Sequence, residues 1–330
     1  MSKTMLGFDI GACELKLVQW DGSKVRRALT APMPDNLVKN GVIISYPAMA
    51  DFIKETAREN RVSGRDCAVI LPASHAFLRR ITVPAMTEEQ LRVNLAYEFW
   101  DFLTLDKDKY FYDYAVNSLD RDEEGTPKQL DLTAAAVPKE VIEDYRDMFR
   151  RAGFRLRTAI PVECAYANLL RAHGDTEGKE FSFLDLGHTA ARLHIFFSGT
   201  RLEATRVIDI GLGSVDEAIS DAMGVDEHVA RTYKHTDYQG AQTLEPAVNV
   251  YNAIALDFRK AVNFYGFNNR ESNLQDAWCC GGGVHIAALL KTIGQSVELA
   301  LHDVSELLPP AAQSAEELSV CAAAIGAAIQ

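Results

Sequence analysis

Apolar and polar residues alternate near the start of the chain in a pattern that predicts paired β-strands. Residues 6–11 read LGFDIG, residues 15–20 read LKLVQW, and an Asp-Gly dipeptide follows them. Strand-like alternation closed by such a dipeptide is typical of a strand–turn–strand unit. Because successive side chains of a strand face opposite sides, Asp9 faces away from its apolar neighbours just before Gly11.

The same pattern returns half a chain later, where residues 183–187 read FLDLG and residues 193–197 read LHIFF. In both blocks a glycine follows the aspartate by two positions and a basic residue follows it by seven. The matching sets are Asp9, Gly11 and Lys16 in the first block and Asp185, Gly187 and Arg192 in the second. Two copies with the same internal spacing, one in each half, indicate an internal duplication.

Residues 77–160 differ from the two strand blocks in their pattern of predicted helices and strands. Strand-like runs and helical stripes predict the order strand, helix, strand, strand, helix, with a capping box at Thr87 and Gln90 and a helix end at Gly153. This order is typical of a compact α+β insertion within a larger domain. The polar stretch from His173 to Glu180 is then the predicted joint between two domains.

Composition narrows the class of protein. The 330 residues are enough for two domains, and 48% hydrophobic with 24% charged residues is ordinary for a globular protein. A formal net charge of −12 disfavours a nucleic-acid surface. We find no apolar run of membrane-spanning length and no signal-peptide core, so we expect a cytoplasmic protein, at most peripheral to a membrane. The six cysteines form no CxxC pair and are expected to be reduced thiols.

The two Asp-x-Gly turns suit phosphate chemistry. Gly11 and Gly187 let a phosphate approach the backbone, and successive N–H groups in such a turn form an anion-binding concavity. Asp9 and Asp185 are the predicted metal residues, since an aspartate beside such a turn can hold Mg²⁺ through water. Two such hairpins facing each other would clamp a polyphosphate and its metal from both sides.

Two further glycine groups could contact a nucleotide. Gly281, Gly282 and Gly283 follow a short apolar strand and precede a predicted helix, where close backbone contact with a base or a phosphate is possible. Gly211 and Gly213 open another predicted helix, for which Ser214 and Glu217 form a capping-box pattern. The chain has no GxxxxGK[ST] motif and no GxGxxG in a βαβ setting, which argues against P-loop and dinucleotide-binding domains.

These motifs resemble those of the actin, Hsp70 and sugar kinase superfamily. Residues 9–16 resemble its first phosphate motif, residues 185–189, which include His188 and Thr189, its second, and residues 281–283 its adenosine motif. Residues 160–165 and 322–328 resemble its two connecting helices. The resemblance implies an α/β fold of the actin-like, duplicated ribonuclease H-like type. Its expected domains are 1–178 plus 321–330, with the insertion at about 77–160, and 179–320, with a smaller subdomain at about 214–270.

Within that superfamily the chain resembles the PilM family of type IV pilus assembly along essentially its whole length. Residues 69–87, 134–142 and 257–265 carry much of the likeness. The insertion resembles the 1C subdomain that this family shares with the FtsA family. The resemblance implies binding of ATP (or ADP) and Mg²⁺. It also implies capture of the N-terminal tail of a PilN-like inner-membrane protein in a groove between subdomains 1A and 1C, alongside other pilus assembly components. The chain would then be recruited to the inner face of the membrane through its partner.

The sequence departs from the family pattern at its expected nucleotide contacts. Ala12 and Cys13 stand where relatives usually carry small hydroxyl residues, which leaves backbone N–H groups as the expected phosphate contacts. Arg231 and Lys234 stand where a Glu-x-x-Lys pair often holds the adenosine. Glu163 matches the position of a carboxylate near the attacking water and is the catalytic candidate, although an ordinary acid in the first turn of a helix explains it equally well. At most a weak ATPase is expected.

Two alternatives stay open. An FtsA-like division protein usually carries a C-terminal amphipathic helix after a linker, whereas this sequence ends at Gln330 directly after the small-residue helix. A small-molecule kinase of the same superfamily usually has a catalytic aspartate in a sugar-site insertion, and residues 77–160 show no such motif. Both are therefore expected to fit less well than a pilus assembly scaffold.

Two segments suggest partner surfaces. Aromatic residues crowd 97–114, which favours the core of a small subdomain over the lining of a peptide groove. Arginines are dense between 146 and 157 on an otherwise acidic chain. They fit either a solvated helix face or a contact with an acidic partner or anionic lipid.

Overall fold

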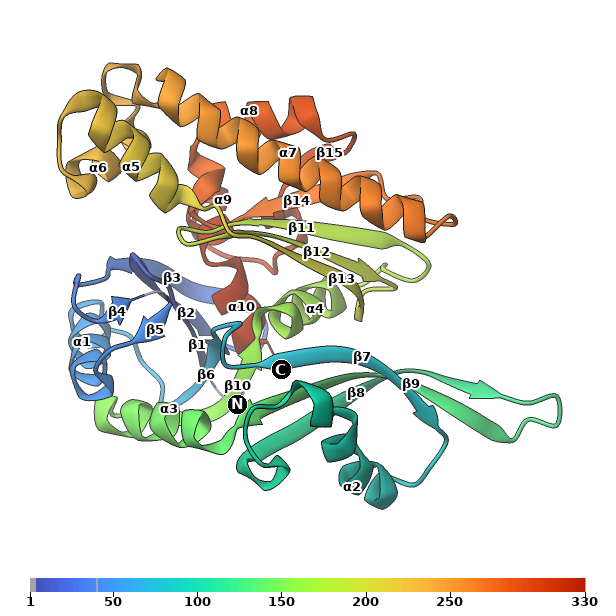
Figure 1. The fold of residues 1–330 in the computed structure, drawn as a ribbon. Coiled ribbons are helices and arrows are strands. Elements are labelled where there is room, and N and C mark those ends of the chain that lie inside the picture. Colours follow the sequence, from blue (N-terminus) through green and yellow to red (C-terminus); the bar gives the residue numbers. More distant parts are fainter. Residues whose placement is uncertain (1–3, 40, 330) are drawn as a thin grey trace.

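The chain forms two lobes, each built around one five-stranded sheet, and a smaller three-stranded sheet extends from the lower lobe (Figure 1). The computed structural model describes residues 4–39 and 41–329. Within this part of the chain the elements follow the predicted order, and the first strand of the second five-stranded sheet begins at Glu180.

The first sheet has the strand order β10-β6-β1-β2-β3. Its strands are β10 (Arg155–Pro161), β6 (Asp66–Leu71), β1 (Met5–Ile10), β2 (Glu14–Trp20) and β3 (Val25–Pro32). β10, β6 and β1 run parallel, and β1, β2 and β3 run antiparallel. Helices α1 (Tyr46–Glu59) and α3 (Lys139–Ala152) bury their apolar stripes against one face of this sheet.

The second sheet repeats that topology with the order β13-β12-β11-β14-β15. Its strands are β11 (Glu180–Leu186), β12 (Ala191–Phe197), β13 (Arg201–Ile208), β14 (Asp276–Cys280) and β15 (Ala300–Asp303). β11, β14 and β15 run parallel, and β11, β12 and β13 run antiparallel. The duplication inferred from sequence spacing is thus a duplication of sheet topology.

Helices on the outer face of the second lobe close its core. These are α5 (Leu212–Met223), α6 (Glu227–Thr236), α7 (Glu245–Asn268) and α8 (Ala287–Ser296). Their buried residues form one apolar cluster with the second sheet. The shorter elements β4 (Val38–Lys39), β5 (Val42–Ile43) and α9 (Ala315–Val320) complete the described chain together with five 3-10 turns.

Two helices join the lobes, as the sequence predicted. α4 (Val162–His173) and α10 (Ala322–Ala328) lie between the sheets, and their buried residues share one core with residues of both sheets (Figure 1). A Cβ atom at Gly326 would lie 2.2 Å from the carbonyl oxygen of Ala165, so only glycine lets the two helices approach this closely. The connecting helices therefore form a tightly packed junction between the two sheets.

The insertion consists of β7 (Phe77–Pro84), α2 (Glu88–Glu98), β8 (Tyr110–Arg121) and β9 (Pro127–Pro138), with the sheet order β7-β9-β8. Its small core is separate from those of the lobes. The capping box at Thr87 and Gln90 is confirmed, because each side chain accepts a bond from the other residue's backbone N–H.

The last part of the predicted insertion packs elsewhere. Tyr145 and Phe149 of α3 are buried in the core of the first lobe, and β10 pairs with β6 of the first sheet. We therefore propose that the insertion is narrower than predicted and ends near Pro138, with the remaining domain boundaries as expected from the sequence.

The aromatic residues of the insertion are partly buried in its core and partly exposed on its surface. Phe99 and Tyr110 belong to the small core, as the favoured interpretation predicted. Tyr97, Trp100, Phe102 and Phe111, in contrast, are about half exposed or more. All six cysteines are free thiols, and no helix among the described residues is long and apolar enough to cross a membrane.

Candidate functional site

The two Asp-x-Gly hairpins have the same internal geometry. In the β1–β2 pair Asp9 lies opposite Lys16, and in the β11–β12 pair Asp185 lies opposite Arg192. The Lys16 ammonium lies 3.0 Å from Oδ2 of Asp9. Each lobe thus places a carboxylate and a cation side by side at the same point of its sheet.

The glycine of each hairpin allows a turn that no other residue would fit. A Cβ at Gly11 would lie 2.9 Å from the Glu14 carbonyl oxygen, and one at Gly187 would lie 2.8 Å from that of Ala190. The Gly11 N–H also donates to the Glu14 carbonyl at 3.0 Å. The tight turn that the sequence predicted for phosphate binding is therefore present in both lobes.

A cavity of about 610 Å³ lies between the two turns. Thirteen of the residues expected to bind a nucleotide or metal line it: Asp9, Gly11, Ala12, Cys13, Lys16, Asp185, Gly187, His188, Thr189, Arg231, Lys234, Gly281 and Gly282. The described residues that line the cavity do not include the other four of the predicted set, which are Gly211, Gly213, Gly283 and Glu163. The fold thus brings most of the predicted set together from both lobes.

The three absent glycines pack behind the cavity. A Cβ at Gly211 would lie 2.3 Å from the His188 carbonyl oxygen, and the Gly213 N–H donates to that oxygen at 2.8 Å. A Cβ at Gly283 would lie 2.5 Å from that of Leu186. In the structure these glycines allow close packing against the turn of the second lobe.

The capping box predicted at Ser214 and Glu217 is wrong. α5 begins at Leu212 with Gly211 as its N-cap, and no side chain caps it. The Leu212 N–H donates to the Gly187 carbonyl at 3.0 Å, and the Gly213 N–H donates to the His188 carbonyl. Because the second turn satisfies these first N–H groups, the helix starts earlier than the side-chain pattern suggested.

Electrostatics couple the two hairpins across the cavity. Burial alone would lower the pKa of Lys16, but the Asp9 charge and hydrogen bond, with a further contribution from Asp185, raise it above its usual value. Burial raises the pKa of Asp185, partly offset by the positive charges of Arg192 and Lys16. The carboxylates and cations of both lobes therefore act on one another as a single charged site.

Asp216, a residue that the sequence interpretation missed, organises the cations on the far side of the cavity. Its carboxylate is fully buried and lies 2.5 Å from the Lys234 ammonium and 3.1 Å from Nε of Arg231. Burial lowers the pKa of Lys234 even though Asp216 opposes that shift. A carboxylate on the apolar stripe of Leu212, Val215 and Ile219 is the sequence signal that could have revealed it.

His188 shares this neighbourhood, since its Nδ1 lies 3.7 Å from Oδ2 of Asp216. Burial lowers the pKa of His188 to about 4, although Asp216 acts in the opposite direction. The imidazole is therefore neutral near pH 7, so the cationic side chains of this wall are those of Arg231 and Lys234.

Glu163 lies on the first turn of α4 with its carboxylate directed at the second sheet. Its Oε1 lies 3.5 Å from the Thr205 hydroxyl and 3.6 Å from Nδ1 of His194. Burial raises its pKa. Since Val162 and Tyr166 of the same helix line the cavity whereas Glu163 does not, its catalytic role stays a prediction.

The glycine run of the second lobe touches its phosphate-type turn. Gly281 has φ +83°, and a Cβ there would lie 2.9 Å from Oδ1 of Asp185. A residue with a side chain would be strained and would displace that carboxylate. The predicted adenosine segment and the second Asp-x-Gly turn therefore form one continuous wall.

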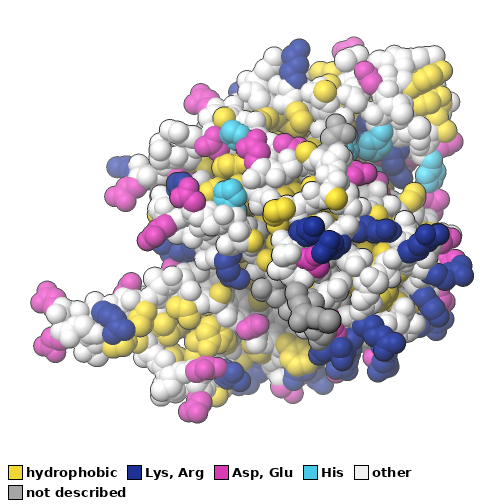
Figure 2. All heavy atoms as spheres, turned by 180° about the vertical axis from the view of Figure 1, so that it is seen from behind, with side chains coloured by type: hydrophobic (Ala, Val, Ile, Leu, Met, Phe, Trp, Pro, Cys, Tyr) yellow, Lys and Arg dark blue, Asp and Glu magenta, His cyan; other side chains and the backbone are white. Residues whose placement is uncertain are grey.

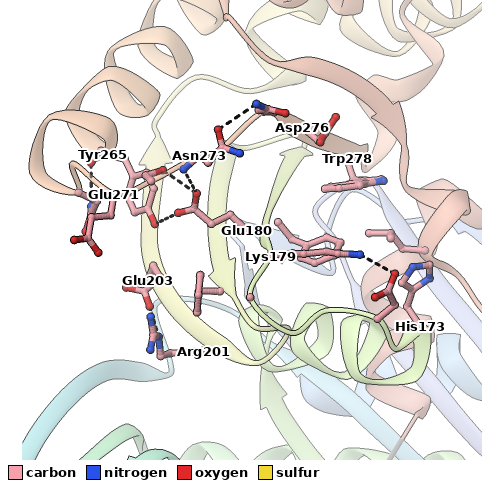
Figure 3. Close-up of a pocket in the computed structure, with 18 of the residues that line it drawn as sticks. His173, Lys179, Glu180, Arg201, Glu203, Tyr265, Glu271, Asn273, Asp276 and Trp278 are labelled. Carbon is pink, nitrogen blue, oxygen red and sulfur yellow. Dashed lines mark hydrogen bonds and ion pairs between the residues drawn. The ribbon is translucent and has the colours of Figure 1, made fainter.

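A second and larger cavity, of about 940 Å³, lies at the starts of β11 and β14 and the end of α7 (Figure 3). Glu180 points into it and accepts hydrogen bonds from the Tyr265 hydroxyl, the Ser272 hydroxyl and the Asn273 N–H. These bonds tie the end of α7 to the sheet. The cavity contains none of the predicted site residues.

Two lobes of equal topology that face each other across paired Asp-x-Gly turns define the actin-like ATPase fold. Solved structures support this class. MreB 5 of Spiroplasma citri bound to AMPPNP has a TM-score of 0.55 at 12% identity, over 99% of this chain and 95% of that one. The ethanolamine utilization protein EutJ from Carboxydothermus hydrogenoformans has a TM-score of 0.61 at 14% identity, over 99% and 89%.

The particular family follows from the sequence. A family profile described as type IV pilus assembly protein PilM matches residues 7–314, so the chain belongs to the PilM family. The fold agrees, since a solved PilM-PilN type IV pilus biogenesis complex has a TM-score of 0.78 at 22% identity, over 99% of this chain and 98% of that one. A search of curated proteins found no match.

Proposed function

We propose that this chain is an ATP-binding scaffold of type IV pilus assembly that holds the N-terminal tail of a PilN-like membrane protein. The observation that carries the proposal is the pair of matched Asp-x-Gly hairpins facing one cavity in a chain of the PilM family. Recruitment to the inner face of the membrane would then come through the partner.

The cavity suits a nucleotide. Lys16 and Arg192 supply positive charge for phosphates, and the turns at Gly11 and Gly187 supply backbone N–H groups. Among the described residues no group of three or more histidine, cysteine or acidic side chains could hold a metal ion by itself. Asp9 and Asp185 would therefore hold Mg²⁺ through water and together with the phosphates, which would neutralise part of their charge.

The side chains around the cavity favour weak turnover of a bound nucleotide. Asp216 pairs with Lys234, which is 1% exposed, and with Nε of Arg231, which is 27% exposed and keeps its other N–H groups for a ligand. Glu163 does not line the cavity, and its Oε1 lies 3.5 Å from the Thr205 hydroxyl, which gives no support to a direct role in hydrolysis. ATP would act chiefly as a structural or regulatory ligand, with at most weak hydrolysis.

The partner groove would lie where the insertion meets α3 of the first lobe. The Lys139 ammonium donates to the Asp108 carbonyl at 2.7 Å and lies 5.6 Å from the ring centre of Phe111. Phe111 is 49% exposed, so its ring offers apolar surface to an extended tail beside this junction. The similarity of this chain to the PilM-PilN complex supports a partner of this kind.

Calorimetry with a synthetic peptide of the PilN-like tail, with and without Mg-ATP, tests this function. We expect saturable binding that Phe111→Ala weakens by roughly tenfold, the loss expected for one buried aromatic anchor. Phe267→Ala is the matched control, because this ring is 79% exposed on α7 of the other lobe and should not contact the tail. Absence of binding in both conditions would contradict the proposal, and phosphoryl transfer to a sugar would support the kinase alternative instead.

A further inference from the structure

Arginines gather at the end of the first lobe that lies opposite the nucleotide cavity. The strand register places five residues side by side, one from each strand, at one end of the first sheet: Arg155, Asp66, Met5, Trp20 and Val25. Asp9 and Gly11 lie at the other end of β1. Figure 2 shows Lys and Arg side chains crowded over the lower right of the molecule, the side on which α1, α3 and β3 lie in Figure 1.

We name this surface the arginine face. It consists of Arg26, Arg27, Arg61, Arg65, Arg155 and Arg157, which come from β3, β10 and the loop that joins α1 to β6. Each is exposed or half-buried. Four of its members lie well outside the arginine-rich segment that the sequence singled out.

The loop between α1 and β6 makes this face continuous. The Arg27 guanidinium donates to the Asn60 carbonyl at one end of the loop, and the Gln19 amide donates to the Ser63 hydroxyl at 3.0 Å in its middle. At its other end the Arg155 N–H donates to the Arg65 carbonyl at 2.7 Å. These contacts tie the loop to β2, β3 and β10, and those of Arg27 and Arg65 involve only backbone carbonyl groups, which carry no net charge.

Positive charge exceeds negative charge on the arginine face. Asp66, which is 2% exposed, pairs with both Arg155 and Arg157, and Asp21 pairs with Arg26. Among the described residues we find no ion pair for Arg61 or Arg65. Six arginines thus face two paired carboxylates and the nearby Glu59, on a chain whose formal net charge is −12.

Arg61 occupies a position where the fold itself favours glycine. It follows the C-cap of α1 with φ +51°, and the Val62 N–H donates to the Ala57 carbonyl at 2.9 Å to close the helix. Glycine is the usual residue at such a left-handed position, and a side chain there has a conformational cost. The arginine is therefore not explained by the local backbone, which points to a use for its exposed charge.

We propose that the arginine face docks the chain on an anionic membrane surface. None of its six arginines lines a cavity found in the described part of the chain, so they suit a broad field of lipid headgroups better than one small ligand. A planar membrane surface would contact only the arginine face, whereas a flexible polyanion that wraps around the protein would also contact its acidic surfaces. Acidic groups farther from the membrane than a Debye length are screened by salt and oppose the docking little. The proposal rests on the proposed function, since the partner's anchor would hold the chain beside the membrane.

Cosedimentation with vesicles tests this proposal without any partner present. The protein is expected to bind phosphatidylglycerol vesicles and not phosphatidylcholine vesicles, and added salt should weaken the binding. The double variant Arg61→Gly with Arg65→Ser should lower the partition coefficient by roughly 30-fold, from about 1 kcal/mol for each arginine near the surface. Arg61→Gly relieves the left-handed strain, so loss of binding would not reflect unfolding.

The control variant is Arg92→Ser with Arg270→Ser, which removes the same charge from exposed sites on the insertion and after α7. It should keep most of the vesicle binding. Equal losses of vesicle binding in both double variants, or no vesicle binding by the unchanged protein, would overturn the proposal. Binding to polyglutamate as strong as that to the vesicles would also overturn it, because it would indicate an acidic protein partner. Calorimetry with the tail peptide should give the same affinity for the Arg61 and Arg65 variant, so failure of the two proposals can be told apart.

Discussion

Arg80 on β7 and Glu203 on β13 form an ion pair of 2.9 Å that joins the insertion to the second lobe. Asp131 on β9 binds the same guanidinium, with contacts of 2.6, 2.9 and 3.0 Å, and Arg201 binds the other side of Glu203. The insertion and the second lobe are thus connected through one arginine.

Removing Glu203 from this link should change motion more than stability. Glu203 is 12% exposed, but Arg80 and Arg201 are 41% and 33% exposed and would stay hydrated without it, so Glu203→Ala should cost only about 1–2 kcal/mol of unfolding free energy. Hydrogen exchange in β7 and β13 should nevertheless become faster, because the strands lose their contact. Glu271→Ala, in an exposed turn of the same lobe, is the control and should leave exchange in β7 unchanged. Unaltered exchange in both strands of the Glu203 variant would show that the pair does not couple the two parts.

Asp216 and Lys234 should behave as an obligate pair. Lys234 is 1% exposed, so Asp216→Ala leaves a buried cation without its counterion and should cost about 3–5 kcal/mol of unfolding free energy. The double variant with Lys234→Met should regain most of that loss, since it removes the stranded charge. Urea unfolding of the two single variants and the double variant measures the coupling. Additive losses would contradict the pairing.

The fold was predictable because its signals are local and repeated. Asp9 with Lys16 and Asp185 with Arg192 are paired through strand register, and spacing along one hairpin is enough to predict such a pair. The capping box at Thr87 was equally visible, since it depends on residues close together in the sequence, whereas the two connecting helices followed from the family resemblance.

What the sequence could not supply depends on contacts between distant segments. The start of α5 is set by carbonyl groups of the second turn, which no side-chain pattern reveals. Asp216 pairs with Arg231 and Lys234 only because α5 packs on α6. α3 follows the insertion in the chain but packs on the first lobe, so its apolar stripe alone could not show to which unit it belongs.

The unfolding free energy should decrease as the pH is lowered, because a histidine is buried in its neutral form. His194 is fully buried, and burial, helped by the charge of Arg192, lowers its pKa to about 3 from an ordinary value of 6.5. In the unfolded chain this imidazole takes up a proton below about pH 6.5, whereas the folded protein does not until about pH 3. Its contribution is therefore complete above pH 6.5 and is lost progressively as the pH falls toward 3.

Replacing that histidine separates its effect from those of other groups. Asn is the suitable replacement, because its side-chain amide can keep a hydrogen bond to the Thr205 hydroxyl, which lies 3.2 Å from Nδ1 of His194. The unfolding free energy of His194→Asn, measured in urea at about pH 7.5, 6 and 5, should decline less steeply than that of the unchanged protein. Parallel declines would show that His194 does not titrate on unfolding.

Cys13 offers a test of how the first turn holds phosphate. It lines the cavity beside Ala12, at a position where related families usually carry a hydroxyl residue, and burial raises its pKa, so it stays a neutral thiol. Cys13→Ser should strengthen Mg-ATP binding by roughly fivefold, from about 1 kcal/mol for one added hydrogen bond. Titration with a fluorescent ATP analogue measures the change. Cys164→Ser is the matched control, because that thiol is also half-buried but lies on α4 outside the lining. An unchanged affinity in the Cys13 variant would mean that backbone N–H groups alone bind the phosphates at this turn.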